Sequence, residues 1–454
     1  MSRCILRFLH AADFQLHRLP AGVAKLPQQL HQVLIDAPLE AARNVFDAAL
    51  ANAVDFVVLS GGIIDVDESS PLALRFLVEQ FQRLNEKNIR VYWAGGPRDL
   101  PGKWPGGLPL PDNVHVFTTD KVESLSFVCD GKPLAAITGM SNSRDRVRAS
   151  DFRAGRDGVF TLGVAAGEAT VEELSSRGVG YWALGGREQP ATVAETPVVI
   201  RYAGSPQGFS PAAVGKHGAT LVTVDDANEV RTQALACDVF RWQNEQLTAT
   251  TATSDEELFV MLSERTTQLI SGAPDKHQLI RWSMVVDDHL GQQLRHEGLG
   301  DELQSRLQQH FANRKPSVWT YELTTQANDN VPAELYEEDT ILGDFLRSLR
   351  EFRTSKGRSL DLETMLANEI HDADAAAAIR AEDTGRDQLL RDVAALGVEM
   401  LSGAAGSDSN AAKIQFRGGG DNGPGGTSMT LKHDGESWQA QQDMAAMLDE
   451  ELAT

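Results

Sequence analysis

The amino-acid sequence predicts an α/β fold in which two sheets form a sandwich, followed by a small α/β domain and a helical C-terminal region. Apolar strands alternate with amphipathic helices over residues 1–100, a pattern typical of a parallel sheet. Shorter strands with fewer helices follow from residue 111 to about 225, which predicts the second sheet. Several of the predicted strands lead into glycine pairs, such as those at 61–62 and 185–186.

Three strands and two helices are predicted in the first hundred residues. The strands at 5–9, 56–60 and 89–93 are short and apolar. Apolar side chains recur at helical spacing over 38–53, which predicts the first helix. The second helix is expected to begin at Ser70, because an N-cap residue is followed there by proline at the first helical position.

The second sheet is predicted from a series of short strands interrupted by a helix at 171–176. The predicted strands are 114–117, 122–128, 134–138, 159–165, 181–184, 198–202 and 220–224.

Five parts of the chain are predicted from these patterns and from changes in composition. They are the two-sheet domain 1–228, a small α/β domain 229–325, a helical region 326–401, a flexible Gly/Ser-rich linker 402–428 and a C-terminal tail 429–454. The small domain is expected to contain a strand near Arg241, helices at 255–270 and 302–311, and strands at 279–286 and 318–323.

The composition restricts the possible partners and the compartment. With 64 acidic and 42 basic residues the formal net charge is −22 at pH 7, which repels phosphate backbones and favours DNA binding only together with a partner. Cys4, Cys129 and Cys237 are widely separated and odd in number, so a reducing cytoplasmic location is expected. No apolar run is long enough to predict a membrane span.

Five short motifs, each at the end of a predicted strand, resemble those of calcineurin-like metallophosphoesterases. The closest resemblance is to the SbcD-type DNA repair exonuclease branch, which implies a metal-dependent phosphodiesterase fold with a capping domain at 229–325. The motifs are RFLHAADFQLH at 7–17, SGGIID at 60–65, VYWAGGPRD at 91–99, FTLG at 160–163 and YWALGGRE at 181–188, and YAGSPQG at 202–208 follows them.

The resemblance also implies positions for the ligands of two divalent metals, and most of these positions have lost their ligands. Two such ions about 4 Å apart repel by about 17 kcal/mol at an effective dielectric constant near 20, so carboxylates and imidazoles must surround them. Asp13 keeps its identity and Glu188 could substitute for another ligand. The remaining metal positions are Gln15, Gly62, Pro97, Gly163 and Gly186, and the catalytic histidine position is Arg98. We therefore expect no catalytic residue and no metal cofactor.

Two hypotheses differ on whether catalysis survives. The preferred one is a degenerate SbcD-like phosphoesterase, a pseudoenzyme that serves as a scaffold or regulatory subunit, with DNA repair as its context. The alternative is an active metal-dependent exonuclease or phosphodiesterase, with a manganese pair or other divalent metals in a rebuilt site. One rebuilt form would hold a single metal between Asp13, His17, Asp65 and Glu188.

A third hypothesis is an anion- or nucleotide-binding module that uses Arg98 and Arg187 in the emptied cleft, because a guanidinium can take the place of a lost cation. The competing interpretation is that these arginines form salt bridges to Asp13 or Glu188. Other polar residues near the motifs have structural interpretations. Asp65, Asp67 and Asp99 are expected to cap turns or helices, and His10 and His17 to be hydrogen-bonded loop histidines.

An apolar stripe in the helical region suggests a partner. By resemblance, the stripe around Ile341, Phe345 and Leu349 would bind a coiled-coil ATPase of the SbcC type, and the chain could form a homodimer. The alternative is that the stripe packs within its own domain. The full stripe is Ile341, Leu342, Phe345, Leu346, Leu349 and Phe352.

Overall fold

The computed structural model describes residues 6–354, with gaps at 24, 130, 145, 154, 156–158, 297 and 327–332, together with residues 390, 393, 394 and 397. All of these residues belong to one unit that spans residues 1–401. The predicted linker 402–428 and tail 429–454 lie outside the described residues, as does most of the predicted helical region beyond residue 354.

The first sheet contains six strands in the order β12-β11-β1-β2-β3-β4. Strands β1 to β4 run parallel, as the strand–helix alternation predicts for β1 to β3, whereas β11 and β12 are antiparallel to their neighbours. The bounds are β1 Leu6–Ala11, β2 Phe56–Leu59, β3 Arg90–Trp93, β4 Val114–Val116, β11 Gly218–Val224 and β12 Val230–Ala236.

Three strands of this sheet correct the sequence analysis. The strand predicted at 114–117 was assigned to the second sheet, but it is β4, which pairs with β3 in the first sheet. The strand predicted at 220–224 was assigned to the second sheet, but β11 pairs with β1 in the first sheet, with Thr220 opposite His10. Strand β12 was not predicted, and it pairs with β11 along its whole length. The hairpin of β11 and β12 therefore crosses the division predicted at residue 228. The division into domains itself stays a prediction.

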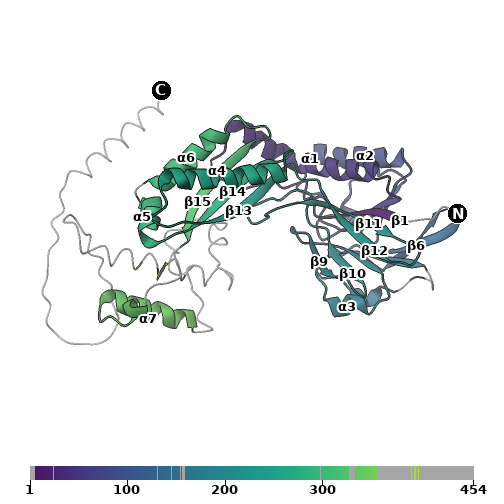
Figure 1. Cartoon of the computed structure of the whole chain (residues 1–454). Coiled ribbons are helices and arrows are strands. Elements are labelled where there is room, and N and C mark those ends of the chain that lie inside the picture. The colour runs from purple at the N-terminus through teal and green to yellow at the C-terminus, as the bar shows by residue number, and fades with distance from the viewer. Residues whose placement is uncertain are drawn as a thin grey trace, which may run out of the picture. The chain divides into compact units, whose positions relative to one another are not determined.

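Helices α1 (Gln28–Ala51) and α2 (Pro71–Asn85) pack on one face of the first sheet (Figure 1). Helix α2 begins as predicted, because the Ser70 side chain accepts a hydrogen bond from the Ala73 backbone N–H at 3.3 Å. Helix α1 begins ten residues before the predicted start and contains Pro38. Burial of Leu30 and Leu34 stabilises this extra segment and offsets the missing proline N–H.

The second sheet also has six strands, in the order β5-β6-β7-β8-β10-β9. Its inner face packs against the first sheet through a shared core that includes Phe8, Phe56, Leu162 and Tyr181, so the predicted two-sheet α/β sandwich is confirmed. The bounds are β5 Glu123–Cys129, β6 Lys132–Gly139, β7 Phe160–Ala166, β8 Tyr181–Gly185, β9 Ala191–Ala194 and β10 Val199–Tyr202, with helix α3 at Val171–Ser175 and 3-10 turns at Pro101–Lys103 and Ala149–Asp151.

A third sheet, of three parallel strands, follows the sandwich. Helices α4 to α6 pack on one face of this sheet, and the other face contacts the first turns of α1 through Leu279 and Trp242. These contacts explain why α1 extends further than its local sequence predicts. The bounds are β13 Phe240–Thr248, α4 Asp255–Gly272, β14 His277–Val285, α5 Asp288–His296, α6 Leu299–Phe311 and β15 Val318–Gln326. The 3-10 turn Ala333–Tyr336 and helix α7, Ile341–Thr354, come next in the chain.

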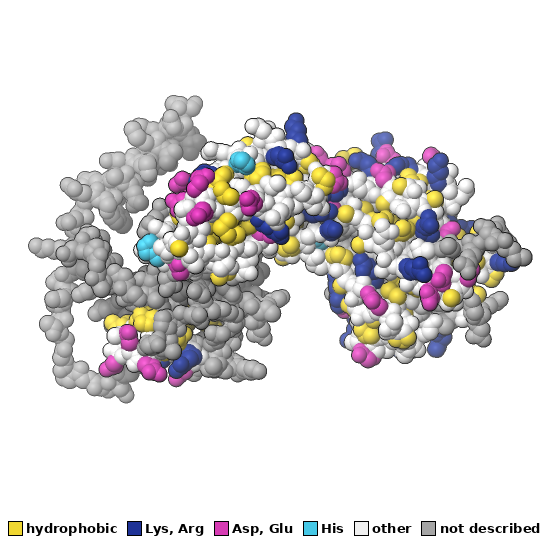
Figure 2. Space-filling view, viewed as in Figure 1, with side chains coloured by type: hydrophobic (Ala, Val, Ile, Leu, Met, Phe, Trp, Pro, Cys, Tyr) yellow, Lys and Arg dark blue, Asp and Glu magenta, His cyan; other side chains and the backbone are white. Residues whose placement is uncertain are grey.

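The surface and the helices bear on two further expectations. On the face shown in Figure 2, basic side chains are scattered among acidic ones and do not gather in one patch. Among the described residues, no helix combines the length and apolar character that crossing a membrane requires.

Candidate functional site

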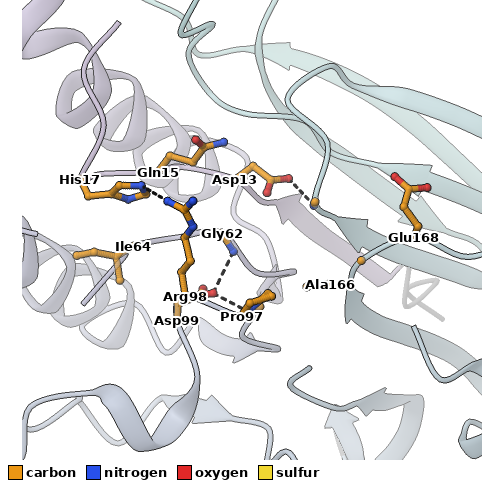
Figure 3. Close-up of a pocket in the computed structure, with 13 residues that line it drawn as sticks. Asp13, Gln15, His17, Gly62, Ile64, Pro97, Arg98, Asp99, Ala166 and Glu168 are labelled. Atoms are coloured by element: carbon orange, nitrogen blue, oxygen red, sulfur yellow. Dashed lines mark hydrogen bonds between the residues drawn. The ribbon is translucent and has the colours of Figure 1, made fainter. Parts of the chain in front are cut away.

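A cavity of about 300 Å³ lies where loops that follow the parallel strands of both sheets meet (Figure 3). Loops after β1, β2 and β3 contribute Asp13, Gln15, His17, Gly62, Ile64 and residues 96–99. Loops after β7 and β8 of the second sheet contribute residues 166–168 and 186. Ligands of α/β proteins commonly bind at this edge of a sheet, so the cavity is the candidate site.

Asp13 lies at the wall of the cavity and is turned toward the second sheet (Figure 3). Its Oδ2 accepts a hydrogen bond from the Gly186 backbone N–H at 2.8 Å. The residue is 5% exposed, and burial raises the pKa of the carboxyl group to about 8, with the negative charge of Asp99 adding to the shift. Burial therefore favours the protonated form of Asp13 when no cation lies beside it.

No side chain fits at Gly62, which lies directly beside Asp13. Its φ of +67° is in the left-handed region that side chains other than Asn and Asp rarely adopt. A Cβ atom at Gly62 would clash with Asp13 Oδ1 and lie 3.0 Å from Asp13 Cα. The position at which the resemblance implies a bridging aspartate thus has no room for a side chain while Asp13 stays where it is.

Asp99 is fully used in holding the loops of the first sheet together. Its carboxylate accepts hydrogen bonds from the backbone N–H groups of Gly62 (3.1 Å), Ile63 (3.1 Å) and Gly96 (2.7 Å). The Trp93 indole N–H donates a fourth bond at 3.0 Å. The interpretation of Asp99 as a turn-capping residue is confirmed. Burial nevertheless raises the pKa of this carboxyl group to about 6, because it outweighs the four donors.

Arg98 forms the other side of the cavity, opposite Asp13 (Figure 3). Its Nη1 lies 3.0 Å from His17 Nε2 and 3.8 Å from Asp65 Oδ2. Asp65 Oδ1 also caps its own turn, by accepting a bond from the Asp67 backbone N–H at 3.1 Å. The expected salt bridge of Arg98 therefore exists, but with Asp65 in place of Asp13 or Glu188.

Arg187 does not reach the cavity. Its guanidinium makes a bidentate contact with Glu168 and stacks over the Tyr202 ring, 3.9 Å from the ring centroid. Glu188 is held by the Phe209 backbone N–H, which donates to its Oε1 at 2.6 Å, and lies 3.8 Å from Arg18. Because Glu168 holds Arg187, the structure does not bring Arg98 and Arg187 together in the lining of the cavity, and the anion site stays a prediction.

The position predicted for a later histidine is also corrected. Gly163 lies in the middle of β7, where an added Cβ would lie 2.6 Å from the Trp182 ring. The strand continues to Ala166, and it is Ala166, Gly167 and Glu168 that line the cavity. The motif alignment was three or four residues too early, and neither register places an imidazole there.

His10 lies within β1 and not in a loop as expected. One ring nitrogen lies 2.9 Å from Tyr181 Oη and the other 2.9 Å from Ser60 Oγ. Burial, with a smaller contribution from Arg201, lowers the pKa of the imidazole to about 3. This neutral histidine joins the two sheets beneath the cavity, a contact that the motif alone does not predict.

The residues at the implied ligand positions do not fit a pair of divalent metals. Of these positions only Asp13 offers a carboxylate to the cavity, and it is hydrogen-bonded to Gly186. Gln15 retains an amide oxygen, but Arg18 donates to it at 3.2 Å. The others offer no ligand atom in the side chain or are turned elsewhere: Gly62, Pro97, Gly163, Gly186 and Glu188.

Comparisons with known proteins give one substantial likeness. An uncharacterized metallophosphoesterase of Bacillus subtilis (strain 168), YhaO, is 29% identical over 356 residues, which cover 74% of this chain and 85% of the relative. No family model matches the sequence.

Two solved structures resemble parts of the fold. Entamoeba histolytica Vps29 complexed with zinc is 12% identical and covers 51% of this chain and 100% of its own, with a TM-score of 0.25. A Thermotoga maritima protein solved by NMR is 14% identical over 51% of this chain and 99% of its own, with a TM-score of 0.23. Scores this low add nothing to the fold established above.

Proposed function

We propose that this chain lacks the two-metal centre and acts as a scaffold or regulatory subunit. Its likeness to a metallophosphoesterase supports membership of that superfamily. The observation that carries the proposal is that no side chain fits at Gly62. A two-metal centre needs a carboxylate that bridges both ions, and a Cβ atom here would meet Asp13 Oδ1. The chain therefore has the fold of the superfamily, but the Asp13 carboxylate occupies the space that a bridging side chain at position 62 would need.

The protonation of Asp13 supports the same proposal. A metal ligand must be ionised, and burial raises the pKa of the Asp13 carboxyl group to about 8, so a divalent cation would have to displace a proton from it at pH 7. Two ions would need further anionic ligands, but Glu168 is paired with Arg187 and Asp99 already accepts four bonds. No carboxylate of the described lining is left to replace the missing bridge without breaking a contact of the fold.

The first prediction is that the purified protein shows no phosphodiesterase activity. Manganese-dependent hydrolysis of bis-p-nitrophenyl phosphate should not exceed the rate in buffer, and metal analysis should not find two ions per chain. Thermal melting of the same preparation controls for folding. A manganese-dependent rate that disappears in Asp13→Asn, or two ions that Asp13→Asn removes, would establish the rebuilt enzyme instead.

We propose further that the chain is an SbcD-like subunit, with DNA repair as its context, that works with an SbcC-like coiled-coil ATPase. The support is the stripe on α7. Leu342 and Leu346 are buried, whereas Ile341 is 79% exposed at the start of the helix. The Phe345 ring contacts Gly397, so part of the stripe packs within the chain. The net charge of −22 counts against DNA contact by this chain alone, so the proposed contact with DNA is made through the partner.

The second prediction concerns this partner surface. Ile341→Asp should weaken co-purification with an SbcC-like ATPase by about tenfold, because a charge replaces an exposed apolar contact. Val260→Asp, at an exposed apolar position of α4, is the matched control and should leave binding unchanged. Equal binding by wild type and Ile341→Asp would exclude this end of α7 as the contact.

A further inference from the structure

A second group of metal-ligating side chains lies beside the cavity, at residues other than the metal-ligand positions that the resemblance implies. His17, Asp65 and Glu68 each offer one ligand atom, and these three atoms lie within 4.8 Å of one another. His17 comes from the loop after β1, and the two acids come from the turn after β2. The three side chains are independent of Asp13 and Gly62, whose arrangement excludes the two-metal centre.

Asp65 provides an observation beyond proximity. The residue is only 7% exposed, yet its Oδ2 accepts no hydrogen bond from the residues that the structure describes. The nearest positive group is Arg98 Nη1 at 3.8 Å, beyond hydrogen-bonding distance. Asp65 Oδ2 therefore keeps its capacity to accept, and a cation at coordination distance would be a closer partner for it than Arg98 at 3.8 Å.

His17 provides a third observation. Its Nδ1 lies 3.3 Å from the Asp65 backbone N–H, and its Nε2 lies 3.0 Å from Arg98 Nη1. Both neighbours are donors, but a neutral imidazole has only one nitrogen that can accept. In one of the two contacts, an N–H group of the imidazole therefore faces another N–H donor, and no hydrogen bond can form there. Since 61% of the Arg98 side-chain surface is exposed, the guanidinium can leave at little cost in packing.

We propose that His17, Asp65 and Glu68 bind one divalent transition-metal ion, zinc or manganese, and that Arg98 occupies the cation position when the ion is absent. One imidazole nitrogen and two carboxylate oxygens, without a thiolate, suit these ions. Three protein ligands leave coordination positions open to water or to an anionic group. This site differs from the family's two-metal centre, and it can exist whether or not the chain is catalytic.

The experiment is calorimetric titration of the chelator-treated full chain with zinc chloride and, separately, manganese chloride. We expect saturation at one ion per chain for at least one of the metals. His17→Ala and Asp65→Asn should each weaken that binding about tenfold or more. Arg98→Ala should strengthen it roughly fivefold, because a competing positive charge is removed.

Two matched controls separate ligation from general attraction to an acidic surface. Asp67→Asn removes a negative charge from the same turn without removing a proposed ligand, and Arg187→Ala removes a cation that is paired with Glu168. Both variants should bind the ion as the wild type does. Equal weakening in Asp67→Asn and Asp65→Asn would show nonspecific attraction and overturn the site.

The remaining outcomes separate this site from the proposed loss of the two-metal centre. No saturable binding in wild type and in Arg98→Ala, or binding unchanged in His17→Ala, overturns the single-ion site and leaves the proposed function in place. Two ions per chain that are lost in Asp13→Asn overturn the proposed function instead. One ion that survives Asp13→Asn and is lost in His17→Ala supports both.

Discussion

Asp99→Ala should lower the free energy of unfolding by about 4 kcal/mol or more, because hydrogen bonds to a charged acceptor contribute about 1.5–3 kcal/mol each. The side chain accepts four bonds, from Gly62, Ile63, Gly96 and the Trp93 indole. Its removal leaves these four donors without their acceptor in a buried part of the protein, since Asp99 itself is only 2% exposed. The alanine variant also loses the connection between the loops after β2 and β3.

Urea denaturation at constant pH measures this effect. Asp67→Ala is the control, because the Asp67 side chain is exposed and pairs only with Lys103 in the described part of the chain. We expect a change of about 0.5 kcal/mol or less for that control. A loss below about 1 kcal/mol in Asp99→Ala would show that the loops hold together by their own packing.

In the parallel half of the sandwich, the pairing of β1, β2 and β3 could be predicted because strands and helices alternate locally there, whereas β4 follows a loop and was assigned to the second sheet. Each strand of that half pairs with one that follows it after a single helix or loop, so order in the sequence gives order in the sheet. The antiparallel edge could not be predicted in this way. Strand β11 returns to pair with β1 after more than two hundred residues, and its local pattern equals that of a strand in the second sheet.

The same difference explains which parts of the site could be predicted. Motifs at strand ends identified Asp13 and Arg98 as neighbours of one cleft, and both line the cavity. The motifs could not show that Arg187 is held by Glu168, because a rotamer and a contact between two loops decide that. They also could not show that Gly62 leaves no space, since this follows from its backbone angle and from where Asp13 points.

The fifth prediction is that stability falls as pH rises from about 5 to 8, and that Asp13→Asn reduces this slope. Burial raises the pKa of Asp13 from 3.8 to about 8, so over this range the folded chain keeps a proton that the unfolded chain releases. The folded state therefore loses stability with rising pH. At about 1.4 kcal/mol for each pKa unit, the full shift corresponds to a loss on the order of 5 kcal/mol.

Asparagine at position 13 tests this cause directly. It tolerates the φ of +53°, keeps an oxygen for the Gly186 N–H and cannot ionise, so the variant should match or exceed the wild type at pH 8. Melting temperatures at pH 5, 6, 7 and 8 give the slopes, with Asp67→Asn expected to retain the wild-type slope. Burial also raises the pKa of Asp99 to about 6, so a smaller pH dependence of stability should remain below pH 6 in the variant.

If Asp13 served as a metal ligand, the pH dependence of stability would have the opposite sign. Metal binding favours the ionised carboxylate, so stability would then rise with pH. An unchanged slope in Asp13→Asn would exclude Asp13 as its cause, and a metal-dependent rise in the wild type would restore this residue as a ligand.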